Sequence, residues 1–166
     1  FGATFKGNRD QVSTQLNPFD YSVKARFLRV QIVSFSGHLS LRLGVLVPRT
    51  LKPVKAIFTN KKTLRTSELA ILDPSTGSRE SSGDYNHNSC RHGMLSDSHG
   101  WCAAENANGH WYVADLGEAM PVQGIATKGR ADSSQWLKEY SVFVSNDNEN
   151  WYAVDEGKRF QGNRNN

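Results

Sequence analysis

A short sequence phrase occurs twice in this chain, once near each end. Residues 5–10 read FKGNRD, and residues 160–165 read FQGNRN. A phrase repeated one domain length apart indicates that the chain is one period of a repeat, cut within the unit. The sequence therefore predicts a domain whose two halves appear in reversed order along the chain.

Composition limits the class of protein. The 166 residues are 37% hydrophobic and 10% aromatic, which is enough for one domain with a core and too aromatic for a disordered chain. No apolar run approaches the roughly 20 residues that span a bilayer. The net charge of +4 favours acidic partners such as phospholipid headgroups or sulfated glycans. The basic residues are dispersed and no nucleic-acid motif is present, so we expect no nucleic-acid partner.

Alternating apolar and polar residues predict strands. Residues 28–32 read LRVQI, which places leucine, valine and isoleucine on one face and arginine and glutamine on the other. Further strands are expected at 39–47, 111–117, 122–127, 139–145 and 151–154. No segment shows a sustained 3.6-residue period, so almost no helix is expected. Many short strands separated by turns indicate a β-sandwich or barrel.

Residues 48–79 are different from the rest. They contain three prolines and a run of lysines, and they alternate weakly. A short strand at 54–58 and a helical turn or edge strand at 64–72 are the only elements suggested there. The segment is therefore either a linker or a source of extra strands.

The strand motifs resemble one known family, the discoidin domain, also called the coagulation factor V/VIII type C domain. Residues 111–117 (WYVADLG), 122–130 (VQGIATKGR), 136–140 (WLKEY) and 145–151 (SNDNENW) resemble the middle of that domain. The stretches that resemble its closing part are 5–8, 17–19, 25–30 and 37–43. The resemblance implies an all-β, galactose-binding-domain-like jelly-roll sandwich.

The chain departs from the family pattern in two ways. Its order is inverted, and the family's closing cysteine is not found after residues 43–46. A circular permutation explains both departures, because neighbouring termini are joined at little entropic cost. We therefore expect one domain over 1–166, in which 1–47 is the family's C-terminal portion, 48–79 the linker and 80–166 the rest. The alternative is that the two halves belong to neighbouring domains and complete each other between chains.

Cysteine and histidine cluster in one loop-rich stretch. Cys90 and Cys102 are consistent with a local disulfide, or with two free thiols. Together with His87, His92 and His99 they also include enough ligand types for a tetrahedral zinc site. The spacing of these residues matches no known zinc module, so the disulfide is preferred to a metal.

No other cofactor is expected. Several sandwich modules of this family hold a structural calcium ion, and the resemblance makes Asp73 and Asp84 weak candidates for such a site. No nucleophile, zinc-protease or phosphate-loop pattern is present, so we expect no enzymatic activity.

The resemblance implies binding through loops at one end of the sandwich. The segments 84–88, 96–101 and 129–136 are expected there, with the turn 35–38 at the rim. The candidate ligand-binding residues are His38, Tyr85, Asn86, His87, His99, Arg130, Asp132 and Trp136. Planar donors and acceptors beside an aromatic ring suit a sugar, whereas membrane insertion needs bare apolar tips. We expect a secreted or extracellular module for adhesion and recognition of cell-surface or matrix glycans. The alternatives are an anionic phospholipid-binding module and a protein-interaction or self-assembling matrix module.

Several of these residues also have structural interpretations. Trp111 and Trp151 lie in strand motifs and are expected in the core. Trp136 is either a core plug or a ligand platform. Arg130 and Asp132 either contact ligand or pair with each other.

Overall fold

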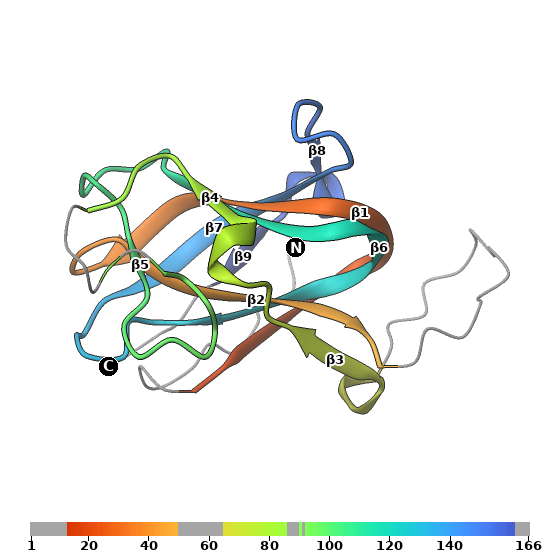
Figure 1. Cartoon of the computed structure of the whole chain (residues 1–166), viewed down its shortest axis with the longest axis horizontal. Coiled ribbons are helices and arrows are strands. Elements are labelled where there is room, and N and C mark those ends of the chain that lie inside the picture. The colour runs from red at the N-terminus through yellow and green to blue at the C-terminus, as the bar shows by residue number, and fades with distance from the viewer. Residues whose placement is uncertain (1–12, 50–64, 86–89, 91, 162–166) are drawn as a thin grey trace, which may run out of the picture.

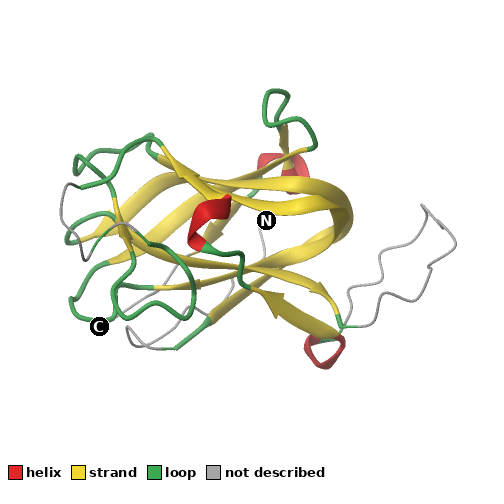
Figure 2. Cartoon of the chain, in the orientation of Figure 1, coloured by secondary structure: helices red, strands yellow, loops and turns green. Residues whose placement is uncertain are grey.

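The computed structural model describes residues 13–49, 65–85, 90 and 92–161, and nearly all of its regular structure is β-strand (Figure 2). The strands are β1 (Gln15–Ser36), β2 (Ser40–Pro48), β3 (Leu69–Leu72), β4 (Arg79–Ser81), β5 (Trp101–Cys102), β6 (Trp111–Lys128), β7 (Trp136–Ser145), β8 (Tyr152–Ala153) and β9 (Arg159–Gln161). Three 3₁₀ turns, η1 (Thr66–Glu68), η2 (Thr76–Ser78) and η3 (Val154–Gly157), complete them. The expected all-β fold is confirmed.

None of the described helical turns is long or apolar enough to cross a bilayer.

Strand β1 is hydrogen-bonded on both of its edges. It pairs antiparallel with β6 on one side and with β7 on the other, within the sheet order β3-β2-β6-β1-β7-β8. At its centre, Val30 lies opposite both Tyr112 and Val142. Strands from the beginning of the chain therefore pair with strands from its end.

The two longest strands run through both layers of the sandwich. In Figure 1, β1 and β6 curve together at one end of the molecule. Residues 15–18 of β1 pair with residues 124–127 of β6, which also pair with β2. Residues 27–31 of β1 pair with residues 111–115 of β6 and also with β7. Irregular pairing between Pro18 and Val23 marks the bend.

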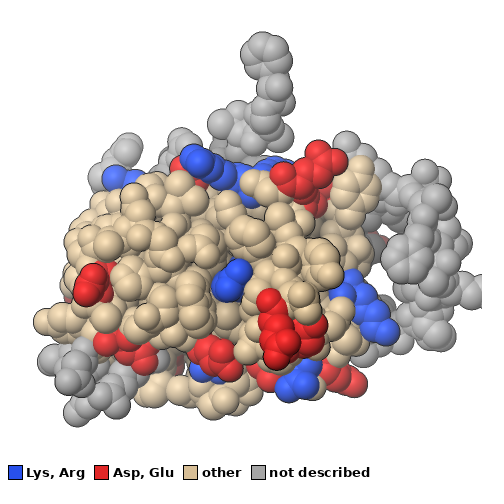
Figure 3. All heavy atoms as spheres, turned by 90° about the horizontal axis from the view of Figure 1, so that it is seen from above, with Lys and Arg blue, Asp and Glu red and all other residues tan. Residues whose placement is uncertain are grey.

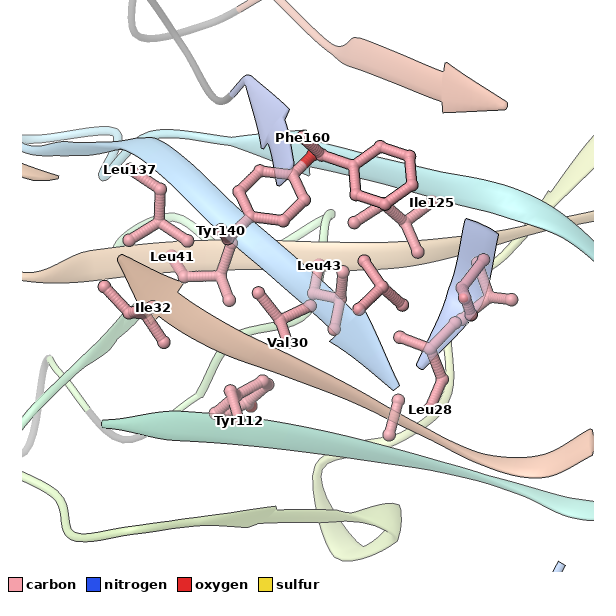
Figure 4. Packing of buried hydrophobic residues seen from close by; sticks show 14 of the residues in the cluster. Leu28, Val30, Ile32, Leu41, Leu43, Tyr112, Ile125, Leu137, Tyr140 and Phe160 are labelled. Atoms are coloured by element: carbon pink, nitrogen blue, oxygen red, sulfur yellow. The ribbon is translucent and has the colours of Figure 1, made fainter. Parts of the chain in front are cut away.

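The core lies between these layers. Leu28, Val30 and Ile32 of β1 are at most 2% exposed, as their alternation predicts. Figure 4 shows them directed toward the same interior as Leu41 and Leu43 of β2. Each buried leucine or isoleucine side chain stabilises the fold by roughly 1.5–3 kcal/mol relative to an exposed one.

Part of the expected linker forms strands. Strand β3 pairs with β2 at the edge of the sheet and buries Leu69, while β4 pairs with β6. The expected strand at 54–58 and most of the repeated phrase lie outside the described residues. The assignment of 1–47 and 80–166 to the two ends of one permuted domain stays a prediction.

Two tryptophans expected in the core lie outside it. Trp111 and Trp151 are only partly buried, and both face the guanidinium of Arg29, whose Cζ lies 5.9 and 4.3 Å from their ring centroids. Phe143, opposite Arg29 on β7, is a third ring at 5.6 Å. The expectation was wrong because Trp111, two residues from Val113, shares the outer face of the sheet with Arg29.

Gly124 provides a test of the close pairing between β6 and β1. A Cβ atom at this position meets the Asn17 carbonyl oxygen and lies 2.7 Å from Pro18 Cα, both in backbone that cannot easily move. We expect Gly124→Ala to destabilise the fold by about 2–3 kcal/mol, measured by urea denaturation. Gly77→Ala, which meets nothing within 4 Å, is the matched control and changes stability by less than about 0.5 kcal/mol. Equal stability of the two variants would contradict this packing.

Candidate functional site

Loops gather at one end of the sandwich, opposite the end where β1 and β6 curve together (Figure 1). We call this the loop end. It consists of the turn 37–39 between β1 and β2, the segments 82–85 and 92–100, the loop 103–110 after β5, and the loop 129–135 between β6 and β7. The structure places the described parts of all three expected recognition segments here.

A disulfide joins Cys90 to Cys102 beneath these loops. The two cysteines are 2% and 1% exposed, and Cys102 lies in β5, where it pairs with Ser40 of β2. The Cys102 amide donates to the Cys90 carbonyl (2.9 Å), and the Tyr85 amide donates to the Cys102 carbonyl (2.9 Å). Cys102 therefore links the loop segments to the sandwich.

The described residues do not form a metal site. The disulfide leaves neither cysteine as a thiolate, and no three His, Cys, Asp or Glu side chains of the described chain converge as ligands. His87 lies outside the described residues. The zinc site that the sequence offered as an alternative to the disulfide therefore lacks its two sulfur ligands.

Asp73 accepts hydrogen bonds from four donors of the protein. One of its oxygens accepts from Arg79 Nη2 (2.8 Å) and the Leu95 amide (2.9 Å). The other accepts from the amide and the hydroxyl of Ser96 (3.1 and 2.9 Å). These four donors occupy the positions that a cation would need.

Asp84 is engaged in a similar way. Its Oδ1 accepts from the indole Nε1 of Trp101 (2.8 Å) and from the Ser81 hydroxyl (2.5 Å). Trp101 is fully buried, so this carboxylate satisfies a core donor that has no access to water. Both aspartates suggested for calcium therefore accept hydrogen bonds from side chains of the protein, and the calcium suggestion stays a prediction.

An arginine, an aspartate and a histidine form the charged part of the loop end. Arg130 grips Asp132 with two parallel hydrogen bonds, Nε to Oδ1 (2.6 Å) and Nη2 to Oδ2 (2.9 Å). This contact, more than any other, holds the pKa of Asp132 below its usual value, and nearby His99 lowers it further. His99 Nε2 lies 4.0 Å from Asp132 Oδ2, and the side chains of His99 and Asp132 are 43% and 40% exposed. The pair expected between Arg130 and Asp132 is present.

Arg130 is itself fixed from below. Its Nη1 donates to Gln135 Oε1 (3.2 Å), which also accepts from the buried Ser40 hydroxyl (3.0 Å). The same Nη1 lies 3.8 Å from Cys102 Sγ, and the Arg130 amide donates to the Gln135 carbonyl (2.9 Å). The guanidinium is thus tied to both β2 and β5.

His38 and Tyr85 form the aromatic part of the loop end. Their rings meet edge to face, with centroids 5.5 Å apart, and Tyr85 is 49% exposed. His38 Nδ1 donates to the Leu39 carbonyl (3.2 Å). Asn106 fixes this turn by accepting from the Leu39 amide (2.9 Å) and donating to the Gly37 carbonyl (3.2 Å). Since Tyr85 also bonds Cys102, the aromatic and charged parts flank the same cysteine.

Arg42 is buried beneath the loop end and joins two of its loops. Its Nε donates to the Gly129 carbonyl (2.7 Å), and its Nη1 donates to the Asp97 carbonyl (2.9 Å). Burial lowers the pKa of its guanidinium. Its role is structural.

The remaining candidates divide into two groups. Trp136 is 8% exposed at the start of β7, where it pairs with Ser36, so its ring is largely buried, which favours the core plug over the ligand platform. Asn86 and His87 lie outside the described residues. Ser40 and Gln135 position Arg130, and Asn106 positions the turn that holds His38. The sequence does not single out these three residues, because Ser40 and Gln135, and likewise Asn106 and Leu39, are distant from each other in sequence.

Comparisons with known proteins agree with the motifs. The model of the F5/8 type C domain family matches residues 74–166. The chain is 29% identical to lactadherin of Rattus norvegicus and 28% identical to lactadherin of Mus musculus, each over 98% of the chain. It spans 39% and 36% of the length of these two relatives. It is also 37% identical to neuropilin-1 of Gallus gallus over 40% of the chain and 8% of that protein.

No solved structure matches the chain significantly. The family match and the two lactadherins support an extracellular binding module.

The disulfide makes a measurable contribution to stability. It closes a loop with a sequence separation of 12 residues, so the double variant Cys90→Ala/Cys102→Ala should lose about 3 kcal/mol in urea denaturation. Ser40→Ala removes a hydroxyl bonded to Gln135 while leaving the bridge intact, and should lose only about 1 kcal/mol. Two titratable thiols in the denatured, unreduced wild-type chain would contradict the disulfide.

The paired hydrogen bonds between Arg130 and Asp132 predict that the stability of the fold depends on pH. Because the folded pKa of Asp132 is lowered, the stability it adds is present above the usual carboxyl pKa of about 4 and is lost as pH falls through the folded value. Asp132→Asn should therefore cost about 0.5 kcal/mol at pH 7, and the cost should shrink toward pH 3. Glu105→Gln, at an exposed position in the loop 103–110, is the control. A carboxyl titration by NMR that places the Asp132 pKa above 4 would refute the effect.

Proposed function

Because the chain belongs to the F5/8 type C domain family, we propose that it is a secreted, non-enzymatic recognition module that binds carbohydrate through the loop end. The observation that carries this proposal is the half-exposed Tyr85 ring in the same loop end as the Arg130–Asp132–His99 cluster: the Tyr85 amide donates to the Cys102 carbonyl, and Arg130 Nη1 lies 3.8 Å from Cys102 Sγ. An aromatic face covers the apolar side of a pyranose, while fixed charged groups bond its hydroxyls.

The polar character of the loop end supports a sugar over membrane insertion. The large hydrophobic side chains exposed among the described residues are Tyr21, Ile71, Tyr85 and Tyr152. Of these only Tyr85 belongs to the loop end, and tyrosine carries a hydroxyl. The neighbouring residues 86–89 read NHNS, which adds no apolar residue to the loop. Insertion into a bilayer gains its energy from buried apolar area, which these groups do not offer.

Rigidity also supports recognition by hydrogen bonding. The side chains of Arg130, Asp132 and Asn106 are held by hydrogen bonds to the protein, so they lose little freedom when a ligand binds. Asp132 keeps its ionised form near neutral pH because its pKa is lowered. A sugar hydroxyl that donates to Asp132 would meet an acceptor already in position.

Anionic phospholipid is the second candidate, favoured by the net charge of +4. On the face in Figure 3, acidic and basic side chains of the described residues are interspersed, with no field of one sign. A bilayer surface attracts a concentrated basic patch more strongly than dispersed charge. We therefore rank a glycan first and a phospholipid headgroup second.

We also propose that residues 1–166 act as one permuted domain. Supporting this, β1 and β2 provide the neighbours of β6 and β7 in the sheet, and the turn between β1 and β2 brings His38 to the loop end. A chain in which these strands came from another molecule would bind ligand only as an assembly.

Tyr85→Ala tests the proposed site. We expect the wild-type chain to bind members of a glycan array at physiological salt, and Tyr85→Ala to bind the same glycans at least about fivefold more weakly, because the loss of an aromatic contact costs about 1 kcal/mol or more. Tyr152→Ala is the matched control, since Tyr152 is 69% exposed on β8, away from the loop end. Phosphatidylserine vesicles are titrated in parallel. Salt-dependent vesicle binding without glycan binding would overturn the proposal in favour of the phospholipid.

A further inference from the structure

The side chain of Phe160 occupies a closed slot in the core. It is 0% exposed and lies on the short strand β9. Its ring stacks on Tyr140 with centroids 6.0 Å apart at 13°, and it meets Phe19 of β1 at 5.7 Å. Figure 4 shows Phe160 beside Tyr140, above the β1 side chains. We call this space the β9 slot.

Strand pairing and hydrogen bonds also fix the backbone around the slot. Strand β9 pairs with β7 through only three residues, with Phe160 opposite Tyr140. The carbonyl of Gln161 accepts from Asn17 Nδ2 (3.1 Å), and the same amide group donates to the Tyr140 hydroxyl. The slot therefore recognises a phenylalanine side chain and the carbonyl group that follows it. Both of these features belong to the repeated phrase.

The chain carries a second segment with the same two features. Residues 5–9 read FKGNR, where residues 160–164 read FQGNR. Lys6 replaces Gln161, but the carbonyl group that Asn17 binds is backbone and is unchanged by this difference. Phe5 and Lys6 lie outside the described residues.

The second segment is within reach of the slot. Asn17 lines the slot and is eleven residues after Lys6, a stretch that can extend to about 35 Å. The first phrase is tethered to the slot through the start of β1, and the second through η3. Tethering gives both segments a high effective concentration at the same place.

We propose that the β9 slot is a docking site for residues 5–9 of the same chain, which exchange there with residues 160–164. Docking of the first phrase displaces Phe160 and Gln161 from the slot. This inference is independent of the ligand at the loop end, because it uses no residue of that site.

A double-mutant comparison tests the exchange. We expect Phe160→Ala to lower the melting temperature by less than half of the decrease seen in Phe160→Ala/Phe5→Ala, because Phe5 refills the slot. Phe5→Ala alone should melt like wild type. If the double variant has the same melting temperature as Phe160→Ala, Phe5 does not dock and the proposal is wrong. Should the alanine variants fail to fold, the same comparison is made with Phe160→Leu and Phe160→Leu/Phe5→Ala.

A peptide measurement separates the two sources of the occupant. The peptide ATFKGNRD, residues 3–10, should raise the melting temperature of Phe160→Ala/Phe5→Ala, whereas ATAKGNRD should not. The difference in melting temperature between Phe160→Ala and Phe160→Ala/Phe5→Ala, which reports refilling of the slot by Phe5, should not vary with protein concentration over about a hundredfold range. A difference that grows with protein concentration would assign the slot to a second copy and overturn docking within the chain. If the peptide ATFKGNRD does not raise the melting temperature of the double variant, docking is also overturned.

Discussion

The fold depends on the double pairing of β1. This strand comes from the start of the chain, yet its two neighbours, β6 and β7, come from the end. It supplies Leu28, Val30 and Ile32 to the core, and its Arg26 makes a two-pronged contact with Asp115 of β6 at 2.9 Å for both bonds. Without β1, both neighbours would present an open edge and an uncovered apolar face, a combination that leads to aggregation.

The geometry of the loop end depends on this pairing of β1. The turn that follows β1 holds His38, and β2 then returns Ser40 beneath Arg130 and pairs it with Cys102. Residues more than 60 positions apart in the sequence thus meet around one disulfide. The loops themselves contain little regular structure, so their order comes from hydrogen bonds to the strands below. Such loops are the usual place for recognition in a rigid sandwich.

The sequence predicted the strands better than the site. Alternation located the core positions of β1 and β2, and the motifs identified the family. Alternation cannot say which of two faces is buried, which is why Trp111 was assigned to the core while it packs on Arg29. The role of Asp73 could not be foreseen, because its partners Leu95 and Ser96 are more than 20 residues away and no periodicity links them. Likewise, Ser40 reads as an ordinary strand residue until Gln135 is placed above it.

The central place of β1 has a consequence for the dynamics of the chain. Amide protons in a strand bonded on both sides exchange with solvent only when the sheet as a whole opens. The slowest-exchanging amides should therefore include those of residues 27–31, near the beginning of the sequence, where chains commonly fray. Deuterium uptake would thus reach the short edge strands β3 and β8 long before it reached this segment.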